Sequence, residues 1–408
     1  MRIVSGVAAI WGGDDDGWGE SFGVAAHVSC ILGVSRGTWT TVKNNVSFRE
    51  SVWYDCPCIT MMQHTAIVSK RLVPSHSQLT DTREVNYYWS SLMSLWGVRG
   101  RRASSSTFFP GCNPRSISTT LAPRLRTQRY HICLKSDGVR YVLFLTTRMG
   151  QPDQGVALMI DRSRHMYEVE VAAPEEHFLQ HTVLEGELVW KQPDEQTMIY
   201  YVFDAVVDRG TRLLTAPFEE RLATATALTR FSSELRNESE TRILETQSVV
   251  LSQFDPHVEM KPKTFVDRMH ATRLWNERNE SEHRVDGIIL QSLDAPYTMG
   301  TAEDDSIFKW KEHSTVDLRG VPPDNVHAAD APLPARLCDR KVVFETSRVA
   351  ATSEKDVVEY HVNVTEREVC LLPVRARPDK TSANGLRVIT ATVEDVMHAI
   401  TPEELAAV

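Results

Sequence analysis

The feature that most constrains this sequence is a series of short apolar, β-branched and aromatic segments separated by polar turns, which begins near residue 108. Turns separate consecutive segments where a βαβ array would need helices. The pattern therefore predicts an α+β fold that is rich in antiparallel sheet. Strands are expected at 130–135, 140–146, 155–160, 166–171, 182–190 and 198–207.

Two helices are expected after these strands, because apolar residues recur there at helical spacing. The first covers 217–231 and starts at a proline, which suits the first turn of a helix. The second covers 263–275. Strand-like sequence returns at 285–291 and 306–310. These elements together predict one domain over residues 107–320.

A span rich in proline and alanine, at 321–334, predicts the end of that domain. Residues 321–408 are expected to form a small β domain that ends in a short amphipathic helix. Thr392 is expected to cap this helix, with acidic residues in its first turn. The strands of the small domain are expected at 336–350, 356–364 and 368–376.

Residues 1–106 show weak periodicity and many glycine, serine, threonine and tryptophan residues, so they stay unassigned. They are a divergent partner domain, a remnant or a poorly ordered segment. The Cys30 to Arg36 spacing matches a phosphate-binding loop of cysteine phosphatases, but chance is favoured because too few residues precede it for the sheet of such a fold. Cys56 and Cys58, with His64 nearby, could begin a metal site, yet no second cysteine pair follows.

Composition narrows the function classes. The net charge of −9 gives no global positive field, so any contact with RNA or a nucleotide has to come from a local basic cleft. No apolar run approaches the ~20 residues that a membrane helix needs. The seven cysteines are odd in number and scattered, which suits a reducing compartment. These features predict an intracellular protein that does not enter a membrane.

The hexapeptide Lys135-Ser136-Asp137-Gly138-Val139-Arg140 lies between two expected strands. A lysine at the end of a strand, with an acid and a glycine close behind it, is placed where a phosphate could meet it. The alternative is a hairpin turn with a solvated lysine. The hexapeptide alone does not decide between the two.

Three further clusters carry charge inside strand-like sequence. Glu187 and Asp286 each lie in an apolar segment, and buried carboxylates need a cation, a metal ion or a hydrogen-bond donor. Lys309 and Lys311 alternate with Trp310, so both lysines project from one face of a strand. Each cluster alone could be an ordinary ion pair or a solvated edge. Together they supply a nucleophile, metal ligands and phosphate-binding cations.

The order of these clusters resembles the six motifs of the covalent nucleotidyltransferases, the superfamily of the mRNA capping guanylyltransferases and the polynucleotide ligases. The resemblance covers about 107–408. It is closest to the capping enzymes, because the lead-in segment 109–117, the Thr315-Val316-Asp317 sequence after the motif lysines and the Arg-x-Asp-Lys signature resemble theirs. The motifs are Lys135–Arg140, Glu185–Leu188, Phe203-Asp204, Asp286–Ile289, Lys309–Lys311 and Arg377–Lys380.

The resemblance implies an enzyme, an mRNA guanylyltransferase. Lys135 would attack the α-phosphate of GTP, carry GMP through a phosphoamide bond and pass it to the 5′-diphosphate end of RNA. The implied fold is a nucleotidyltransferase (ATP-grasp-like) domain at 107–320 followed by an OB-fold domain at 321–408. Glu187 and Asp286 would hold Mg²⁺ or Mn²⁺. Neighbouring cations are expected to lower the pKa of Lys135 and so favour the neutral amine.

The resemblance also implies roles for the residues around GTP. Arg140 and Arg162 would hold the ribose or phosphates, and Phe203 and Ile288 would sandwich the guanine. Ser136 and Lys263 would read the base edge, with Lys261 competing for that role. Arg377, Asp379 and Lys380 would orient the pyrophosphate when the second domain closes. The full set of expected GTP-binding residues is Ser136, Asp137, Gly138, Arg140, Arg162, Phe203, Lys263, Ile288, Lys309, Lys311, Arg377, Asp379 and Lys380.

Two departures from the family pattern keep the chemistry intact. Glu185 stands where aspartate is usual, and Ser136 stands where threonine is frequent but keeps a hydroxyl. The expected partners are an RNA triphosphatase, a cap methyltransferase and the RNA polymerase II C-terminal domain, which implies a nuclear location. The alternatives are an RNA or DNA ligase-like enzyme that uses ATP, and a scaffold that keeps the fold without turnover.

Overall fold

The computed structural model describes residues 72–74, 77–100, 108–193, 197–229, 258–301, 304–322, 325–345, 356–377 and 380–408. The Cys30–Arg36 spacing, the Cys56 and Cys58 pair and Asp379 lie outside these residues. Three sheets organise the described chain, and nearly all of their strand pairs are antiparallel, as predicted; β1 with β12, β7 with β9 and β16 with β18 are parallel. No helix among the described residues is both long enough and apolar enough to span a membrane.

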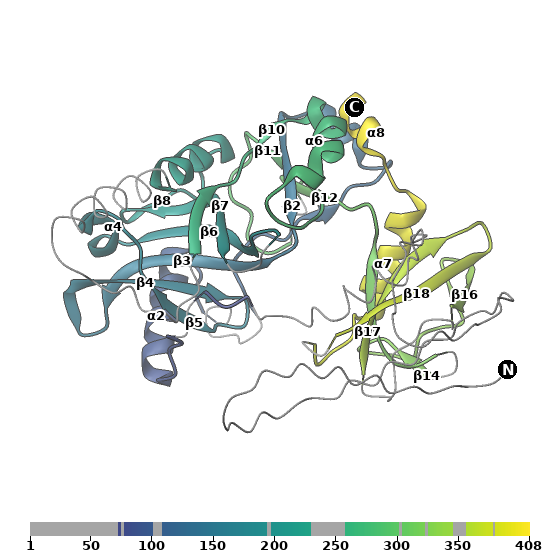
Figure 1. Ribbon diagram of the computed structural model, residues 1–408, viewed down its shortest axis with the longest axis horizontal. Coiled ribbons are helices and arrows are strands. Elements are labelled where there is room, and N and C mark those ends of the chain that lie inside the picture. Colours follow the sequence, from purple (N-terminus) through teal and green to yellow (C-terminus); the bar gives the residue numbers. More distant parts are fainter. Residues whose placement is uncertain are drawn as a thin grey trace, which may run out of the picture. The chain divides into compact units, whose positions relative to one another are not determined.

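The largest sheet has seven strands, in the order β5-β4-β3-β6-β7-β8, with β9 pairing with β7 (Figure 1). Its strands follow the predicted segments closely. Successive side chains of a strand point to opposite faces, so every second residue packs into the same core. The bounds are β3 Val139–Arg148, β4 Gln151–Asp161, β5 Met166–Val169, β6 Thr182–Trp190, β7 Met198–Asp208, β8 Thr211–Arg212 and β9 Val258–Pro262. The short helix α4 covers Glu175–Leu179, and residues 218–229 are helical as predicted.

The helix α2, Thr82–Leu95, packs on one face of this sheet. Asp81 caps it, since its side chain accepts a hydrogen bond from the backbone N–H of Arg83 at 2.8 Å. Trp89 and Leu92 are among the α2 side chains buried in a core shared with β3 and β4. The folded part of the chain therefore begins ahead of residue 107, inside the segment that the sequence left unassigned.

A second sheet has five strands, in the order β1-β12-β11-β2-β10. One of its faces packs against the short helix α6 and forms a core around Ile132, Trp275 and Phe308. The strand bounds are β1 Arg115–Ser116, β2 Tyr130–Ser136, β10 Val266–Asp267, β11 Val285–Ser292 and β12 Ile307–Trp310. The helical turns are η1 Ala122–Arg126, η2 Arg268–His270, α6 Ala271–Asn276 and η3 Glu277–Glu280.

The helix predicted at 263–275 starts later than expected. Val266 pairs with Ile132 of β2, so the chain is extended there and α6 begins only at Ala271. The pairing partner lies more than 130 residues earlier in the sequence, and local spacing cannot reveal it.

The hexapeptide that starts at Lys135 is not a hairpin. β2 pairs with β10 and β11 in the five-stranded sheet, whereas β3 pairs with β4 and β6 in the seven-stranded sheet. Asp137 and Gly138 thus carry the chain from one sheet to the other. A Cβ atom on Gly138 would lie 2.3 Å from the backbone oxygen of Leu188, so only glycine lets the chain pass so close to β6.

The third sheet has six strands, in the order β14-β13-β17-β18-β16-β15, and α7, Leu386–Met397, packs against it. Its bounds are β13 Thr315–Val321, β14 Asn325–His327, β15 Arg336–Leu337, β16 Arg340–Phe344, β17 Val357–Val364 and β18 Glu368–Ala376. Because β13 pairs with β17, the second domain begins between β12 and β13 rather than at 321. The helix α7 starts after Gly385, two turns ahead of the predicted cap at Thr392.

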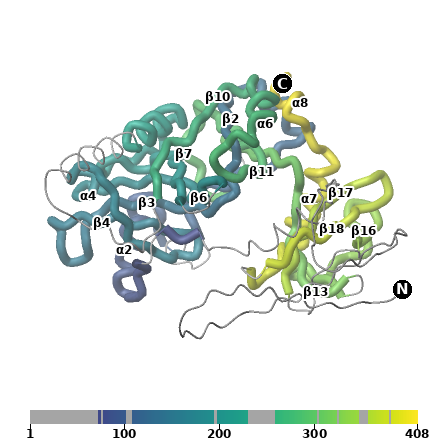
Figure 2. Tube along the Cα trace, in the orientation of Figure 1, coloured from purple at the N-terminus to yellow at the C-terminus, as the bar shows by residue number. Residues whose placement is uncertain are grey.

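The C terminus leaves the third sheet and packs on the second. Helix α8, Pro402–Ala407, begins with a capping box formed by Thr401 and Glu404, and it lies beside α6 (Figures 1 and 2). Leu405 is fully buried in the core of the five-stranded sheet. The indole N–H of Trp310 donates to the backbone oxygen of Ile400 at 2.5 Å.

We expect Leu405→Ala to destabilise the protein by about 2–5 kcal/mol, because it opens a cavity in a closed core. The neighbouring Glu403 is exposed, so Glu403→Ala should change the free energy of unfolding by less than about 0.5 kcal/mol. Denaturant unfolding followed by circular dichroism measures both variants. Equal unfolding midpoints for Leu405→Ala and Glu403→Ala would show that α8 does not belong to this core.

Candidate active site

Asp286 forms ion pairs with two lysines that come from different strands. The Nζ atom of Lys135 lies 2.8 Å from Oδ1 of Asp286, and the Nζ atom of Lys311 lies 2.7 Å from Oδ2. Lys135 comes from the end of β2, Asp286 from the start of β11 and Lys311 from the end of β12. The structure thereby brings together three of the predicted site residues.

The register of the five-stranded sheet explains this meeting. Gly287 is the pairing partner of Lys135, and a Cβ atom on Gly287 would lie 2.0 Å from the backbone oxygen of Trp310. Glycine therefore lets β11 approach the end of β12, where Lys311 follows. Farther along, Ile289 pairs with both Cys133 and Lys309, which places Lys135, Ile289 and Lys309 on the face opposite the apolar core.

The pKa of Lys135 is raised, which corrects the expectation that neighbouring cations lower it. Burial lowers this pKa, but Asp286 and Glu187 outweigh burial. The same contacts lower the pKa of Asp286, although burial acts to raise it. Without a nucleotide, the site therefore holds Lys135 as an ammonium ion.

Lys309 has a different environment. Burial lowers its pKa, and Lys311 and Lys135 lower it further, while Asp395 and Asp286 act against them. Within the described part of the chain, Lys309 forms no ion pair, whereas Lys311 is held by Asp286. Lys309 is thus a cation beside two others without a fixed counter-ion, which suits the binding of a phosphate.

Glu187 lies on β6 and faces this cluster. Burial raises the pKa of Glu187, although Lys135 and Lys263 act against burial. No hydrogen bond or ion pair to its carboxylate occurs among the described residues. The same residues contain no group of three or more histidine, cysteine, aspartate or glutamate side chains that could hold a metal ion. Any ion here would need phosphate oxygens beside Glu187 and Asp286.

Lys263 is buried close to Lys135 but has no carboxylate partner among the described residues. It donates to the Ser136 hydroxyl, and its Nζ lies 3.4 Å from Nε2 of His283 and 4.7 Å from the centre of the Tyr201 ring. Burial lowers the pKa of Lys263. Lys261, by contrast, pairs with Glu259 and Glu282. The structure places Lys263, and not Lys261, beside Ser136.

His283 completes this buried network, and no local sequence pattern marked it as a site residue. Its Nε2 lies 3.0 Å from the Ser136 hydroxyl, and its Nδ1 lies 3.0 Å from the Ser281 hydroxyl. Burial, and then Lys263, lower its pKa to about 4, so the ring is neutral at pH 7. A neutral ring accepts at one nitrogen and donates at the other, which orients Ser136 and Lys263. The only signal was its place three residues ahead of Asp286.

Arg140 is fixed by the segment before β2. Its guanidinium donates to Glu185 at 2.6 Å and to the backbone oxygen of Cys112, and the Tyr297 hydroxyl donates to the same carboxylate at 2.5 Å. Gly111 permits this approach, because a Cβ atom there would lie 2.8 Å from the Arg140 guanidinium. Glu185, the unusual acid of its motif, is fully buried and serves as the anchor of Arg140.

Two aromatic rings flank the same guanidinium. The Arg140 Cζ atom lies 5.7 Å from the centre of the Phe109 ring and 5.4 Å from that of Phe203. Arg162 shares Phe109, at 5.9 Å, and donates to the Asn113 side chain at 2.8 Å. The structure therefore brings Arg140, Arg162 and Phe203 together.

Phe203 is positioned by its neighbour. Asp204 and Arg221 form an ion pair at 2.8 Å with both side chains almost fully buried. Burial raises the pKa of Asp204 to about 6, although Arg221 acts against it. Arg221 also donates to the backbone oxygens of Ala216 and Ala295, so it ties β7 to two other segments.

Ile288 is a predicted site residue that the structure does not bring to the site. It is fully buried in the apolar core of the five-stranded sheet, on the face opposite Lys135. Ile289 lies on the Lys135 face and is only half-buried. The register of β11 against β2 pairs Ile288 with Leu134 and Ile289 with Cys133, so Ile289, and not the Ile288 that the resemblance implied, shares the face of Lys135.

The predicted residues near the C terminus form a separate cluster. Arg377 donates to Asp317 at 3.3 Å, and Lys380 donates to the other oxygen of the same buried carboxylate. Arg377 also contacts Glu359 at 3.5 Å. Asp317 thus holds two of the three residues that were expected to orient pyrophosphate, on the six-stranded sheet.

Comparison with known proteins identifies the family of this chain. The sequence matches the family described as mRNA capping enzyme, catalytic domain, over residues 69–313, which is more than half of the chain. The protein belongs to the mRNA capping enzyme family. This membership confirms the predicted resemblance and the predicted activity class, an mRNA guanylyltransferase, which is a nucleotidyltransferase.

Curated relatives carry the same description. The mRNA-capping enzyme subunit alpha of Schizosaccharomyces pombe is 25% identical over 74% of this chain and 80% of that protein, and the subunit alpha of Neurospora crassa is 29% identical over 53% and 54%. The mRNA-capping enzyme of Caenorhabditis elegans is 23% identical over 72% of this chain and 47% of its own length. The chain thus spans about half the length of the last two relatives. Among solved structures, a mycobacterial DNA ligase D complexed with ATP and MES matches with 14% identity and a TM-score of 0.35, over 68% of this chain and 97% of that one.

Acid should destabilise the protein through His283. Its pKa is lower in the folded state than the usual value of 6.5, so the unfolded chain binds more protons between pH 6.5 and about 4, and stability falls as the pH falls through that window. We expect a loss of about 2 kcal/mol from this residue between pH 7 and pH 5.

Denaturant unfolding at both pH values measures this loss in the wild type and in His283→Gln, which cannot take up the proton. The variant should lose less stability than the wild type between the two pH values. An identical loss in both proteins would show that His283 is not the titrating group.

Proposed function

We propose that Lys135 is the nucleophile of this guanylyltransferase and carries GMP between GTP and RNA. The supporting observation is the point where Lys135, Lys309 and Lys311 meet beside Asp286 and Glu187, because this set offers an amine, phosphate-binding cations and carboxylates together. Membership of the capping enzyme family supplies the reaction class.

In the first half-reaction, the neutral amine of Lys135 attacks the α-phosphorus of GTP. A P–N bond forms, the bond to the β-phosphate oxygen breaks, and pyrophosphate leaves with that electron pair while the amine gives up a proton. The site without a nucleotide favours the ammonium form of Lys135. The carboxylates around Lys135 therefore have to bind another cation before the amine can become neutral. A cation that binds Asp286 weakens the interaction by which Asp286 keeps the proton on Lys135.

The site fits Mg²⁺ or Mn²⁺. Glu187 offers a carboxylate without a partner among the described residues, and Asp286 faces the same cluster. Such an ion typically binds through one or two carboxylates and substrate phosphates, and here it would polarise the phosphate under attack. Lys309 and Lys311 would bind the non-bridging oxygens of the phosphates and stabilise the charge that develops there.

The base and the ribose take the other side of the site. Phe203 and Ile289 would stack on the two faces of the guanine, with Ile289 in place of Ile288. Lys263 and Ser136 would meet the guanine edge, since a lysine donor suits the O6 acceptor of guanine and not the amino group of adenine. Arg140 and Arg162 would face the ribose or the phosphates.

The second domain would complete the cycle. We propose that Arg377 and Lys380 leave Asp317 and orient pyrophosphate, together with Asp379, as an OB-fold-like domain closes on the loaded site. Reopening would release pyrophosphate and admit RNA. We further propose a nuclear location, with an RNA triphosphatase, a cap methyltransferase and the RNA polymerase II C-terminal domain as partners.

Label from α-³²P-GTP should stay on the denatured wild-type protein in an acid-labile bond and be absent from Lys135→Ala. Lys341, a lysine on β16 outside the site, provides the matched control, and Lys341→Ala should label normally. The test is autoradiography after denaturing electrophoresis. Label that comes from ATP instead of GTP would indicate the ligase-like alternative, and label that persists in Lys135→Ala would refute the assignment of the nucleophile.

Lys263→Met should lower the preference for GTP over ATP by roughly 10–100-fold, because it removes a charge-assisted hydrogen bond to the base. Lys261→Met is the control, since Lys261 pairs with Glu259 and Glu282. The ratio of initial labelling rates with the two nucleotides measures the preference. An unchanged ratio in Lys263→Met, or a loss only in Lys261→Met, would refute the assignment of the base-reading lysine.

A further inference from the structure

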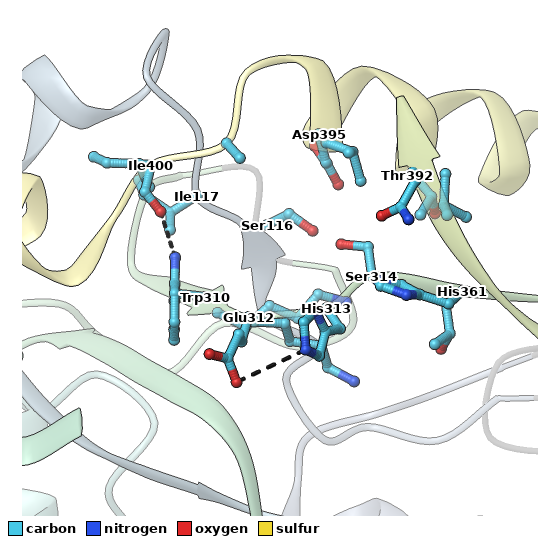
Figure 3. Close-up of a pocket in the computed structure, with 17 residues that line it drawn as sticks. Ser116, Ile117, Trp310, Glu312, His313, Ser314, His361, Thr392, Asp395 and Ile400 are labelled. Atoms are coloured by element: carbon cyan, nitrogen blue, oxygen red, sulfur yellow. Dashed lines mark hydrogen bonds and ion pairs between the residues drawn. The ribbon is translucent and has the colours of Figure 1, made fainter. Parts of the chain in front are cut away.

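A pocket of about 200 Å³ lies beside the active-site lysines (Figure 3). Lys309 and Lys311 line one part of it, and β1, β17 and α7 supply the rest. Trp310 and Ile400 form an apolar wall. The residues proposed to bind guanine, Ser136 and Lys263, do not line it. The pocket therefore adjoins the phosphates of the site but is separate from its nucleoside part.

Hydrogen bonds join the walls of this pocket. The backbone N–H of Val362 on β17 donates to the oxygen of Ser314 at 3.0 Å, and the Trp310 indole donates to the oxygen of Ile400. The N–H of Thr119 donates to the oxygen of His398, just after α7, at 2.9 Å. The first two bonds join lining residues directly, and the third joins the segments that follow β1 and α7 close to the pocket.

We propose that this pocket binds the first nucleotide of the acceptor RNA, with its 5′-diphosphate against Lys309. The inference rests on the proposed function, because the acceptor has to reach GMP on Lys135. In this second half-reaction, an oxygen of the terminal phosphate of the acceptor attacks the phosphorus of GMP. The new P–O bond replaces the P–N bond, and Nζ of Lys135 takes the electron pair and a proton.

The lysine end of the pocket suits the diphosphate. Lys309 belongs to the Lys135 face of the sheet and has no ion pair among the described residues, and it also lines the pocket. An acceptor phosphate bound by Lys309 would therefore lie next to the phosphorus carried by Lys135. The same cation would earlier have faced the departing pyrophosphate, so one lysine serves both halves of the cycle.

Polar oxygen atoms suit a ribose. Asp395 on α7 hydrogen-bonds Ser116 of β1, and Ser314 lies close by in the same pocket (Figure 3). A carboxyl group is a frequent partner of ribose hydroxyls. The 2′-hydroxyl is the group by which a protein distinguishes RNA from DNA at one position. We therefore assign Asp395 to the ribose of the first nucleotide.

Two imidazole rings suit a base. His313 and His361 lie edge to face with their ring centres 4.6 Å apart, and both line the pocket (Figure 3). His361 comes from β17 and is half-buried, while His313 is exposed, so a ring face is open to a ligand. Stacking on an aromatic ring accepts any base, as a capping reaction on many transcripts requires.

The test separates the two half-reactions in the full chain. Protein labelled with ³²P-GMP is isolated and then chased with a short RNA that carries a 5′-diphosphate. In His361→Ala, the adduct should form at the wild-type rate, but the RNA concentration for half-maximal transfer should rise by about tenfold, which is typical for the loss of one base-stacking ring. His361→Phe keeps a ring and should restore most of the transfer.

Matched variants sharpen the result. His327 lies on β14 outside the pocket, so His327→Ala should leave both half-reactions unchanged. For the ribose, the wild type should transfer GMP faster to an RNA with a 2′-hydroxyl on its first nucleotide than to the 2′-deoxy analogue. Asp395→Asn should reduce that ratio.

Three outcomes would overturn the inference. Normal adduct formation with unchanged transfer in His361→Ala and Asp395→Asn would show that RNA binds elsewhere. An equal loss in both half-reactions would assign the pocket to GTP. The absence of any adduct in the wild type would overturn the proposed function itself, and the inference with it.

Discussion

The passage of the chain from one sheet to another within two residues determines the geometry of the whole site. β2 ends at Ser136 in the five-stranded sheet, and β3 begins at Val139 in the seven-stranded sheet. Lys135 and Arg140 are therefore close in sequence but belong to different layers, and each is fixed by the partners of its own sheet. The narrow contact of Gly138 with β6 brings Glu187 to the same place, because Glu187 immediately precedes the residue that Gly138 contacts. A hairpin would have left the lysine at an exposed turn.

The second constraint is electrostatic. A protein with a net charge of −9 gathers several cations at this point, and among them Lys135, Lys311 and Arg140 are each paired with an acid in the described chain. Asp286 holds Lys135 and Lys311, and Glu185 holds Arg140. A charged ligand can replace such an acid only where the acid side chain can move to another partner. Glu185 is fully buried and fixed by Tyr297, so Arg140 is a permanent part of the wall, whereas Asp286 is partly exposed and can exchange partners.

Sequence patterns predicted the strands of the seven-stranded sheet well, because alternation alone sets which residues enter a core. The predicted bounds of β6 are those observed, and Lys135, Asp286 and Lys311, which were expected to share one site, meet in the structure. The failures share a cause, since each depends on a partner distant in sequence. The register of β11 against β2 places Ile289, and not Ile288, on the Lys135 face, and the pairing of Val266 with β2 delays α6. His283 matters only because Ser136 and Lys263 fold against it, and nothing local marks it.

Under the proposed function, Lys309 would serve two successive ligands. Burial and the neighbouring Lys311 and Lys135 lower its pKa, while Asp395 and Asp286 act against them without forming an ion pair with it. A lysine locked to a carboxylate would have to break that pair for each incoming phosphate. A lysine that is held by neither acid keeps a donor ready for whichever phosphate arrives. Pyrophosphate has to leave before an acceptor phosphate can enter the same place, so the order of the two half-reactions would follow from the presence of a single shared cation.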